Sequence, residues 1–417
     1  MNKLQKFLNA NNYNFYFIIG FFYLCTILSF YFNLDPNGGA NLDYLNQKRI
    51  SRIFSENFLK TLFIFDQFST RHSPVLLSIL SIFEKISVPD LYIRLIAFHF
   101  CMILPLLFYK LLRLRFNEFG TINTLLLTSI IFLSPTFISL AIWPDSRIYG
   151  IIFFVISLIY YSKFETQNNL NDALKCTFWY AISSYFSLNF AIFSIFFILK
   201  FFNFFKFKKE IFFLILFNII LALPALVYTF SLESFFFFKS AIPGKDFDLR
   251  DSLNFSNKIL IISSIILFYL IPFFLSKLVK INFNNLKIIF FSILIVFICS
   301  FYFDYDPNYT GGGIFFKISQ KIFNNNFTFF IISILALIVI LNLSKLNPYN
   351  GLIIILLILS NIQFSIYHKY YDPLLFILFF SIFDLNLNNK KIKKIKFGYF
   401  YLFSLLFLAL NYIKQVL

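Results

Sequence analysis

Apolar blocks alternate with short polar segments along most of this 417-residue chain. The blocks are roughly 20 residues long, which is the length an α-helix needs to cross the hydrocarbon core of a bilayer. This pattern predicts an all-α polytopic membrane protein with about 13 transmembrane helices. We expect residues 1–417 to form a single integral membrane domain.

The first long interruption of this pattern is the polar segment from Asp35 to Pro74, which follows a predicted helix over about residues 15–34. Within it, apolar residues recur at helical spacing: Leu45, Ile50, Ile53, Phe54, Phe58 and Leu62. This spacing predicts amphipathic juxtamembrane helices that lie on the membrane face. The next apolar run, Ser73 to Phe83, is too short to span and is also expected at the interface.

The charged residues indicate the orientation of the chain. The net charge is +17, and the Lys and Arg residues cluster in short loops between apolar blocks. Cytoplasmic loops carry such clusters, so Lys3 and Lys6 place the N-terminus in the cytoplasm and the 35–74 segment outside. This role explains the basic residues without a nucleic-acid partner. The 68 phenylalanines, with abundant Ile, Asn, Lys and Tyr, are typical of an AT-rich bacterial genome and favour a bacterial inner membrane.

The rest of the chain is expected to cross the membrane repeatedly. Further helices are predicted at about 91–112, 121–140, 149–161, 211–230, 259–275, 288–303, 327–343, 351–367, 373–385 and 398–415. A polar cytoplasmic loop is expected over 163–175. We expect 176–205 to form a hairpin that bends near Ser187–Asn189, because this keeps the lysines at 206, 208 and 209 in the cytoplasm.

The chemistry available to the chain is that of acids and cations on the external face. Motifs for phosphate loops, zinc proteases and serine hydrolases are absent from the sequence, and the three histidines exclude a His-rich metal site. A carboxylate can act as a general base toward a hydroxyl. Arg and Lys can hold a phosphate and stabilise its charge as it departs. Such pairs on one face favour glycosyl transfer from a lipid-phosphate donor.

The order of these features resembles the GT-C superfamily of integral membrane glycosyltransferases, especially its protein-mannosyltransferase and aminoarabinose-transferase branch. The matching pieces are Leu42-Asp43-Tyr44, His72-Ser73-Pro74-Val75-Leu76, Ile93-Arg94-Leu95-Ile96 and LSPTFISLAIWPDSRIYG. They form a GT-C-like core over about residues 15–200, whereas 201–417 agrees only in its helix-rich layout. Asp43 lacks the second adjacent acid that the family often has, and His-Ser-Pro-Val replaces His-Pro-Pro-Leu.

The resemblance implies an enzyme of cell-envelope glycan synthesis. Such an enzyme moves a sugar from a polyprenyl-phosphate-linked donor to a lipid-linked glycan or other acceptor on the extracytoplasmic face. It implies that Asp43 is the base or orients the acceptor, and that Asp145 is a second catalytic acid. The candidate substrate-binding residues are Arg71, His72, Arg94, Arg147, Lys317 and Lys369. We assign no metal ligand or cofactor. Asp43 and Asp145 could share a divalent cation, but the branch that the chain resembles works without one, so metal dependence stays open.

Alternatives remain for the function and for single residues. A polyprenyl-linked glycan flippase would need polar residues along the helix interiors, and these helices are almost free of charge. An O-antigen-type polymerase would place its essential residues in the later external loops. Asp43 could instead cap a helix that begins at Tyr44. Arg94 could brace the first loop, and a neutral His99 could bond a neighbouring helix.

Overall fold

The computed structural model describes residues 3–68, 70, 72–231, 254–281, 283–308 and 311–416, so Arg71 lies outside the described residues. All regular secondary structure in these ranges is helical. The main helices, in chain order, are α1 (Lys3–Tyr31), α2 (Ala40–Glu56), α3 (Phe58–Phe63), α4 (Pro74–Lys85), α5 (Asp90–Cys101), α6 (Ile103–Arg115), α7 (Thr121–Ser129), α8 (Pro135–Ile142), α9 (Ser146–Gln167), α10 (Leu170–Phe186), α11 (Ser194–Phe205), α12 (Lys209–Ser231), α14 (Phe255–Leu275), α15 (Leu286–Ser300), α16 (Gly313–Phe323), α17 (Phe327–Leu346), α18 (Pro348–Leu359), α19 (Leu374–Ser381), α20 (Asn389–Ile392) and α21 (Phe397–Val416).

Several of these helices are suited to a membrane. Within the described ranges, 6 are long and apolar enough to cross one, counting α5 with α6 and the short helix η3 (Leu188–Phe193) with α11 as single spans. A bent pair, α7 to η2 (Ile130–Leu133) and then α8, gives a seventh, with a 66° angle at its break. This arrangement agrees with the expected α-helical membrane protein. The count of about 13 crossings stays a prediction, as do the bacterial inner membrane and the cytoplasmic N-terminus.

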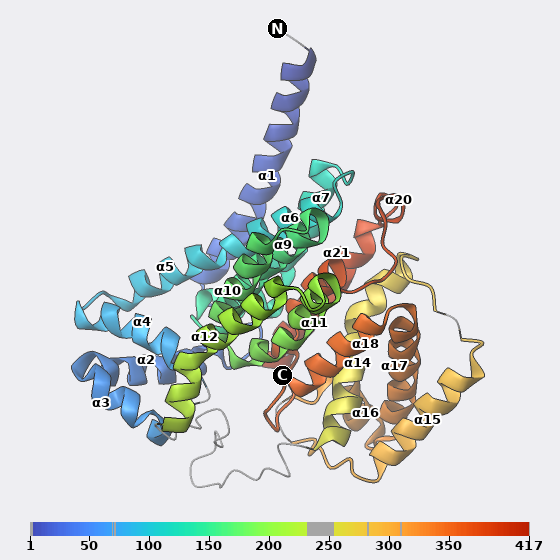
Figure 1. The fold of residues 1–417 in the computed structure, drawn as a ribbon. Helices are drawn as coiled ribbons and strands as arrows, with labels where there is room; N and C mark the ends of the chain where they lie inside the picture. Colours follow the sequence, from blue (N-terminus) through green and yellow to red (C-terminus); the bar gives the residue numbers. More distant parts are fainter. Residues whose placement is uncertain are drawn as a thin grey trace.

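The predicted amphipathic helix is α2. Its buried face includes Tyr44, Ile50 and Phe54, whereas Leu42 and Leu45 are exposed. Figure 1 shows α2, α3 and α4 grouped beside one another at the lower left, away from the projecting end of α1. The Tyr44 hydroxyl donates to Asp90 at 2.7 Å, and Lys48 donates to the same carboxylate at 2.6 Å. These bonds fix the rotation of α2 against the start of α5.

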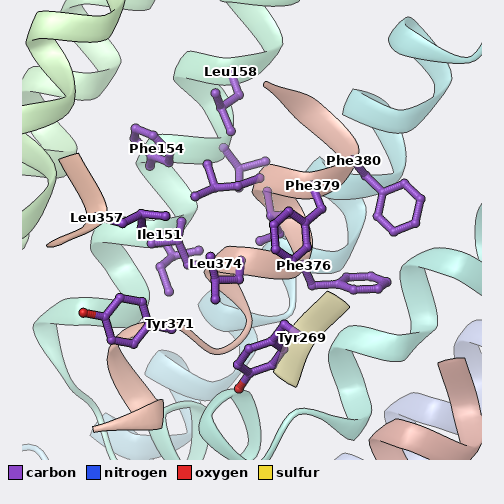
Figure 2. Close-up of a cluster of buried hydrophobic side chains, with 14 of the residues drawn as sticks. Ile151, Phe154, Leu158, Tyr269, Leu357, Tyr371, Leu374, Phe376, Phe379 and Phe380 are labelled. Atoms are coloured by element: carbon purple, nitrogen blue, oxygen red, sulfur yellow. The ribbon is translucent and has the colours of Figure 1, made fainter. Parts of the chain in front are cut away.

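The earlier part of the chain, about residues 15–200, and the later part, 201–417, share one hydrophobic core (Figure 2). Ile151, Phe154 and Leu158 of α9 lie in the same cluster as Leu374 and Phe376 of α19. The later helices therefore pack directly on the earlier ones, which brings the polar segments at their ends together.

The structure corrects three predicted boundaries. The expected loop over 163–175 is mostly helical, because α9 continues to Gln167 and α10 begins at Leu170. The helix expected over 351–367 ends at Leu359, and the helix expected over 373–385 is the shorter α19. The break predicted near Ser187–Asn189 is confirmed, since α10 ends at Phe186.

A buried carboxylate joins the start of α19 to α8. Asp372 is 4% exposed, and its Oδ2 accepts hydrogen bonds from the Ser134 hydroxyl at 2.5 Å and the Thr136 amide at 3.1 Å. Burial raises the pKa of Asp372 to about 6, although the donors on Ser134, Thr136 and Tyr269 oppose this rise. The folded protein therefore binds this proton more tightly than the unfolded chain does.

This pKa shift predicts that Asp372 makes the protein more stable in mild acid. As pH falls through about 6, the folded carboxyl takes up a proton that the unfolded carboxyl, with a pKa of about 3.9, does not bind. Between about pH 7.5 and about pH 5 the gain is on the order of 1 kcal/mol. Asp372→Asn should lose this slope in the midpoint of thermal unfolding, and the exposed Glu56→Gln should keep it. An equal slope in wild type and Asp372→Asn would contradict the assignment.

Candidate functional site

A polar cavity of about 290 Å³ lies where the first long polar segment meets three later parts of the chain. These are the turn between α8 and α9, the turn between α10 and η3, and residues 360–373, which we name the wall segment. The polar and aromatic lining includes Asp43, Asn46, Thr70, His72, Ser73, Ser146, Arg147, Phe186, Asn189, Gln363, Tyr367, Lys369 and Tyr370. Four residues predicted from sequence therefore line one cavity: Asp43, His72, Arg147 and Lys369. A fifth, Asp145, lies beside it, with its Oδ2 3.9 Å from His72 Nδ1.

Asp43 and Lys369 form an ion pair across the cavity. The Lys369 ammonium donates to Asp43 Oδ2 at 3.0 Å, although the residues are 326 positions apart. Burial and Arg147 would lower the pKa of Lys369, but Asp43, Tyr370 and Asp145 raise it above its usual value. Lys369 is therefore charged at neutral pH. Helix α2 begins at Ala40 with Gly39 as its cap, so the alternative that Asp43 caps this helix is wrong.

Asp145 has a structural role as well as a place beside the cavity. Its Oδ1 caps α9 by accepting from the Arg147 amide at 2.8 Å, and the residue is 2% exposed. Its Oδ2 has no hydrogen-bond partner among the described residues and lies 3.9 Å from His72 Nδ1. Burial would raise the pKa of Asp145, but the charges of Arg147 and Lys369 and the hydrogen bond from the Arg147 amide bring it below its usual value. Asp145 is therefore ionised at neutral pH.

His72 is neutral in this site. Its Nδ1 lies 3.4 Å from the Ser146 hydroxyl, in an interaction whose donor depends on the tautomer. Burial lowers the pKa of His72, although Asp145 and Asp43 oppose the effect. His72 can therefore donate a hydrogen bond to a substrate oxygen or offer a lone pair to a metal, but it supplies no positive charge at neutral pH.

Three side chains of the site fit a divalent cation. Asp43, His72 and Asp145 each offer one ligand atom, and these atoms lie within 4.8 Å of one another. Two carboxylate oxygens and an imidazole nitrogen are ligands that several divalent metals accept. The Oδ2 of Asp145, which has no hydrogen-bond partner among the described residues, faces the His72 ring. A cation there would compete with the Lys369 ammonium for Asp43.

Arg147 is held against an aromatic ring of the wall segment. Its guanidinium carbon lies 4.3 Å from the centroid of the Tyr370 ring. This contact is within the range of a cation–π interaction and fixes the plane of the guanidinium. Arg147 thus contributes a fixed positive charge to the cavity beside the more flexible Lys369.

A turn of three glycines, Gly311–Gly313, supports the wall segment from its other side. All three have positive φ, and the Gly312 amide donates to the Ile366 carbonyl at 2.8 Å. A Cβ on Gly311 would lie 2.7 Å from that carbonyl oxygen, so only glycine permits the approach. The Ile314 amide, at the start of α16, donates to His368 Nε2 at 3.0 Å. The residue next to Lys369 is thus tied to α16.

Arg94 and Lys317, the other predicted site residues that the structure describes, are not among the residues that line the cavity. Arg94 is 7% exposed, and its guanidinium lies 3.7 Å from the Trp143 ring and donates to Asn33 at 2.7 Å. It braces the end of the first predicted helix rather than the first loop that the alternative named, and its substrate-binding role stays a prediction. Lys317 lies on α16 and contacts the Pro307 carbonyl. His99 bonds Tyr23 at 3.0 Å, which confirms the expected contact with a neighbouring helix.

Sequence reasoning missed the uncharged part of the lining. Asn46, Asn189, Gln363, Tyr367 and Tyr370 all face the cavity. Asn189 lies at the predicted bend, and Tyr370 follows Lys369, so both were near a detectable signal. Gln363 fell inside the helix expected over 351–367 and had none.

The contacts of Arg94 predict a structural phenotype. Arg94→Lys keeps the charge but loses the flat stacking on Trp143 and the fork that reaches two acceptors. We expect a loss of about 1–3 kcal/mol, seen as a lower midpoint of thermal unfolding. The exposed Arg49→Lys serves as the matched control and should change the midpoint little. An unchanged midpoint in Arg94→Lys would remove the bracing role.

Comparison with known proteins gives no family for this chain. No protein-family model, curated protein or solved structure matches it.

Proposed function

We propose that the chain is a GT-C-type membrane glycosyltransferase, which moves a sugar from a polyprenyl-phosphate-linked donor to a lipid-linked glycan or another acceptor on the extracytoplasmic face. The observation that carries the proposal is the Asp43–Lys369 pair beside Arg147 in one polar cavity. A base for the acceptor and cations for the leaving phosphate are the groups that this reaction requires. The order of motifs over residues 15–200 supports the same class.

The proposed reaction uses these groups in one displacement. The acceptor hydroxyl gives its proton to Asp43 while its oxygen bonds to the anomeric carbon of the donor sugar. The bond from that carbon to the donor phosphate oxygen breaks, and its electron pair leaves with the polyprenyl phosphate. Lys369 and Arg147 stabilise the charge on this phosphate. Because the phosphate competes for the Lys369 ammonium, donor binding frees the Asp43 carboxylate to accept the proton.

The other lining residues suit the recognition of a sugar. Tyr367 and Tyr370 offer aromatic faces, and Asn189 and Gln363 offer amides that bond hydroxyl groups. Such a mixture of apolar faces with a few placed polar groups is typical of small-ligand sites. A divalent cation held by Asp43, His72 and Asp145 would add positive charge beside the phosphate.

The base assignment is tested with purified protein in lipid, polyprenyl-phosphate sugars as donors and a lipid-glycan extract as acceptor. Asp43→Asn should lower the rate of donor consumption by about 10²–10⁴-fold, because that is the usual contribution of a general base. Glu56→Gln removes another carboxylate from α2, outside the cavity lining, and should leave the rate unchanged. Parallel reactions with a chelator report whether turnover needs a divalent cation.

Two outcomes would redirect the proposal. Equal turnover in Asp43→Asn and wild type would move the base to another carboxylate, with Asp145 tested next. If wild type consumes no donor but carries polyprenyl-linked glycan across the bilayer, the transferase proposal is wrong and the transporter alternative replaces it.

A further inference from the structure

A second, smaller cavity lies behind Arg147. Its volume is about 20 Å³, and its polar lining comprises Arg147, Ser187, Asn189, Ser360, Asn361, Tyr370 and Tyr371. Four of these residues, Arg147, Ser187, Asn189 and Tyr370, also line the larger cavity. The Arg147–Tyr370 contact is therefore common to the walls of both.

Three buried polar groups on this lining each keep a donor hydrogen that has no acceptor in the part of the chain that the structure describes. They are Arg147 Nη1, Asn361 Nδ2 and the Tyr371 hydroxyl. Asn361 and Tyr371 are each only 2% exposed. Buried polar groups nearly always have partners, so an ion or a water is the expected explanation for three together.

All three groups can donate a hydrogen bond into the cavity. The Asn361 Oδ1 accepts from the Gln363 amide at 3.1 Å, which orients the amide so that its nitrogen is the free end. Figure 2 shows the Tyr371 hydroxyl directed away from Leu374 and Ile151, out of the hydrophobic cluster. Burial raises the pKa of Tyr371, although a hydrogen bond from one N–H of the Asn361 side chain opposes this, so the hydroxyl keeps its proton. The second N–H of Asn361 and the Tyr371 O–H stay available to the cavity.

We propose that Arg147, Asn361 and Tyr371 form a binding site for a single small anion of halide size, such as chloride. The guanidinium supplies a full positive charge, and the other two groups supply neutral donors. Among the residues that the structure describes, no carboxylate lines this cavity, and Asp145 is engaged with the Arg147 amide and faces His72.

The size of the cavity selects the class of anion. A space of about 20 Å³ is enough for one water-sized particle, since a water needs roughly 10–15 Å³ by the same measure. Phosphate, sulfate and carboxylate ions are larger than this space. A halide there would hold the guanidinium against Tyr370 from behind and so set the side that Arg147 presents to the larger cavity.

The site is tested by titrating full-length protein in lipid with sodium chloride, with sodium gluconate keeping the ionic strength constant. The midpoint of thermal unfolding should rise saturably with chloride and with bromide, but not with inorganic phosphate. Tyr371→Phe removes one donor and should raise the apparent Kd by about tenfold or more. The control is Tyr401→Phe on α21, which removes a hydroxyl that bonds Ser129 and does not line this cavity. This variant should bind chloride like wild type.

A second variant guards against a fold defect. Asn361→Asp keeps the oxygen that accepts from Gln363 but places a negative charge among the donors, so it should abolish the chloride response. Equal midpoints in chloride and gluconate for wild type would show that chloride does not bind, and the same chloride response in wild type and Asn361→Asp would show that chloride binds elsewhere. Either result would overturn the proposal. The assay contains no sugar donor, so its failure leaves the transferase proposal standing, and the reverse also holds.

Discussion

The site depends on hydrogen bonds that hold one mostly irregular stretch of backbone, the wall segment between α18 and α19, whose only regular part is the short 3-10 helix His368–Tyr370. Backbone outside a helix needs partners from elsewhere, and within a membrane protein these come from other parts of the chain. Here the glycine turn supplies an amide to Ile366, and α16 supplies one to His368. Because the wall segment is held on that side, its other side presents Lys369 and Tyr370 to the cavity.

The charged side chains that meet at the larger cavity balance one another before any substrate arrives. Asp43 and Asp145 are matched by Lys369 and Arg147, and burial keeps His72 neutral. A buried charge without a partner is strongly destabilising, so this pairing lets four charged side chains stand close together. A phosphate that enters would take Lys369 from Asp43, and this exchange links donor binding to the exposure of the proposed base.

Much of the site was predictable because membrane topology is a simple constraint. The sequence placed Asp43, His72, Asp145, Arg147 and Lys369 in loops on one face, and loops on one face can meet however far apart they are in the chain. Asp43 and Lys369 do so across 326 positions. The same reasoning, applied to the lysines after α11, predicted the break after Phe186 that positions Asn189. The pattern of charged residues thus predicted which loops carry the charged side chains of the site, but not where each side chain lies within it.

The uncharged lining was hidden because its structure is decided by distant contacts. Residues 351–367 are apolar with no Gly or Pro after Gly351, so the local pattern favours helix to the end. The helix instead stops at Leu359, and the hydrogen bonds that hold the next residues come from the glycine turn and α16, about 50 positions earlier in the chain. The hydrophobic pattern of residues 351–367 cannot reveal hydrogen-bond partners that lie so far away in the chain. Asn361 and Gln363 therefore read as isolated polar residues in an apolar run, although the irregular backbone brings them to the walls of the two cavities. The charged groups that would perform the transfer follow from topology, whereas the groups that would select its sugar follow only from the fold.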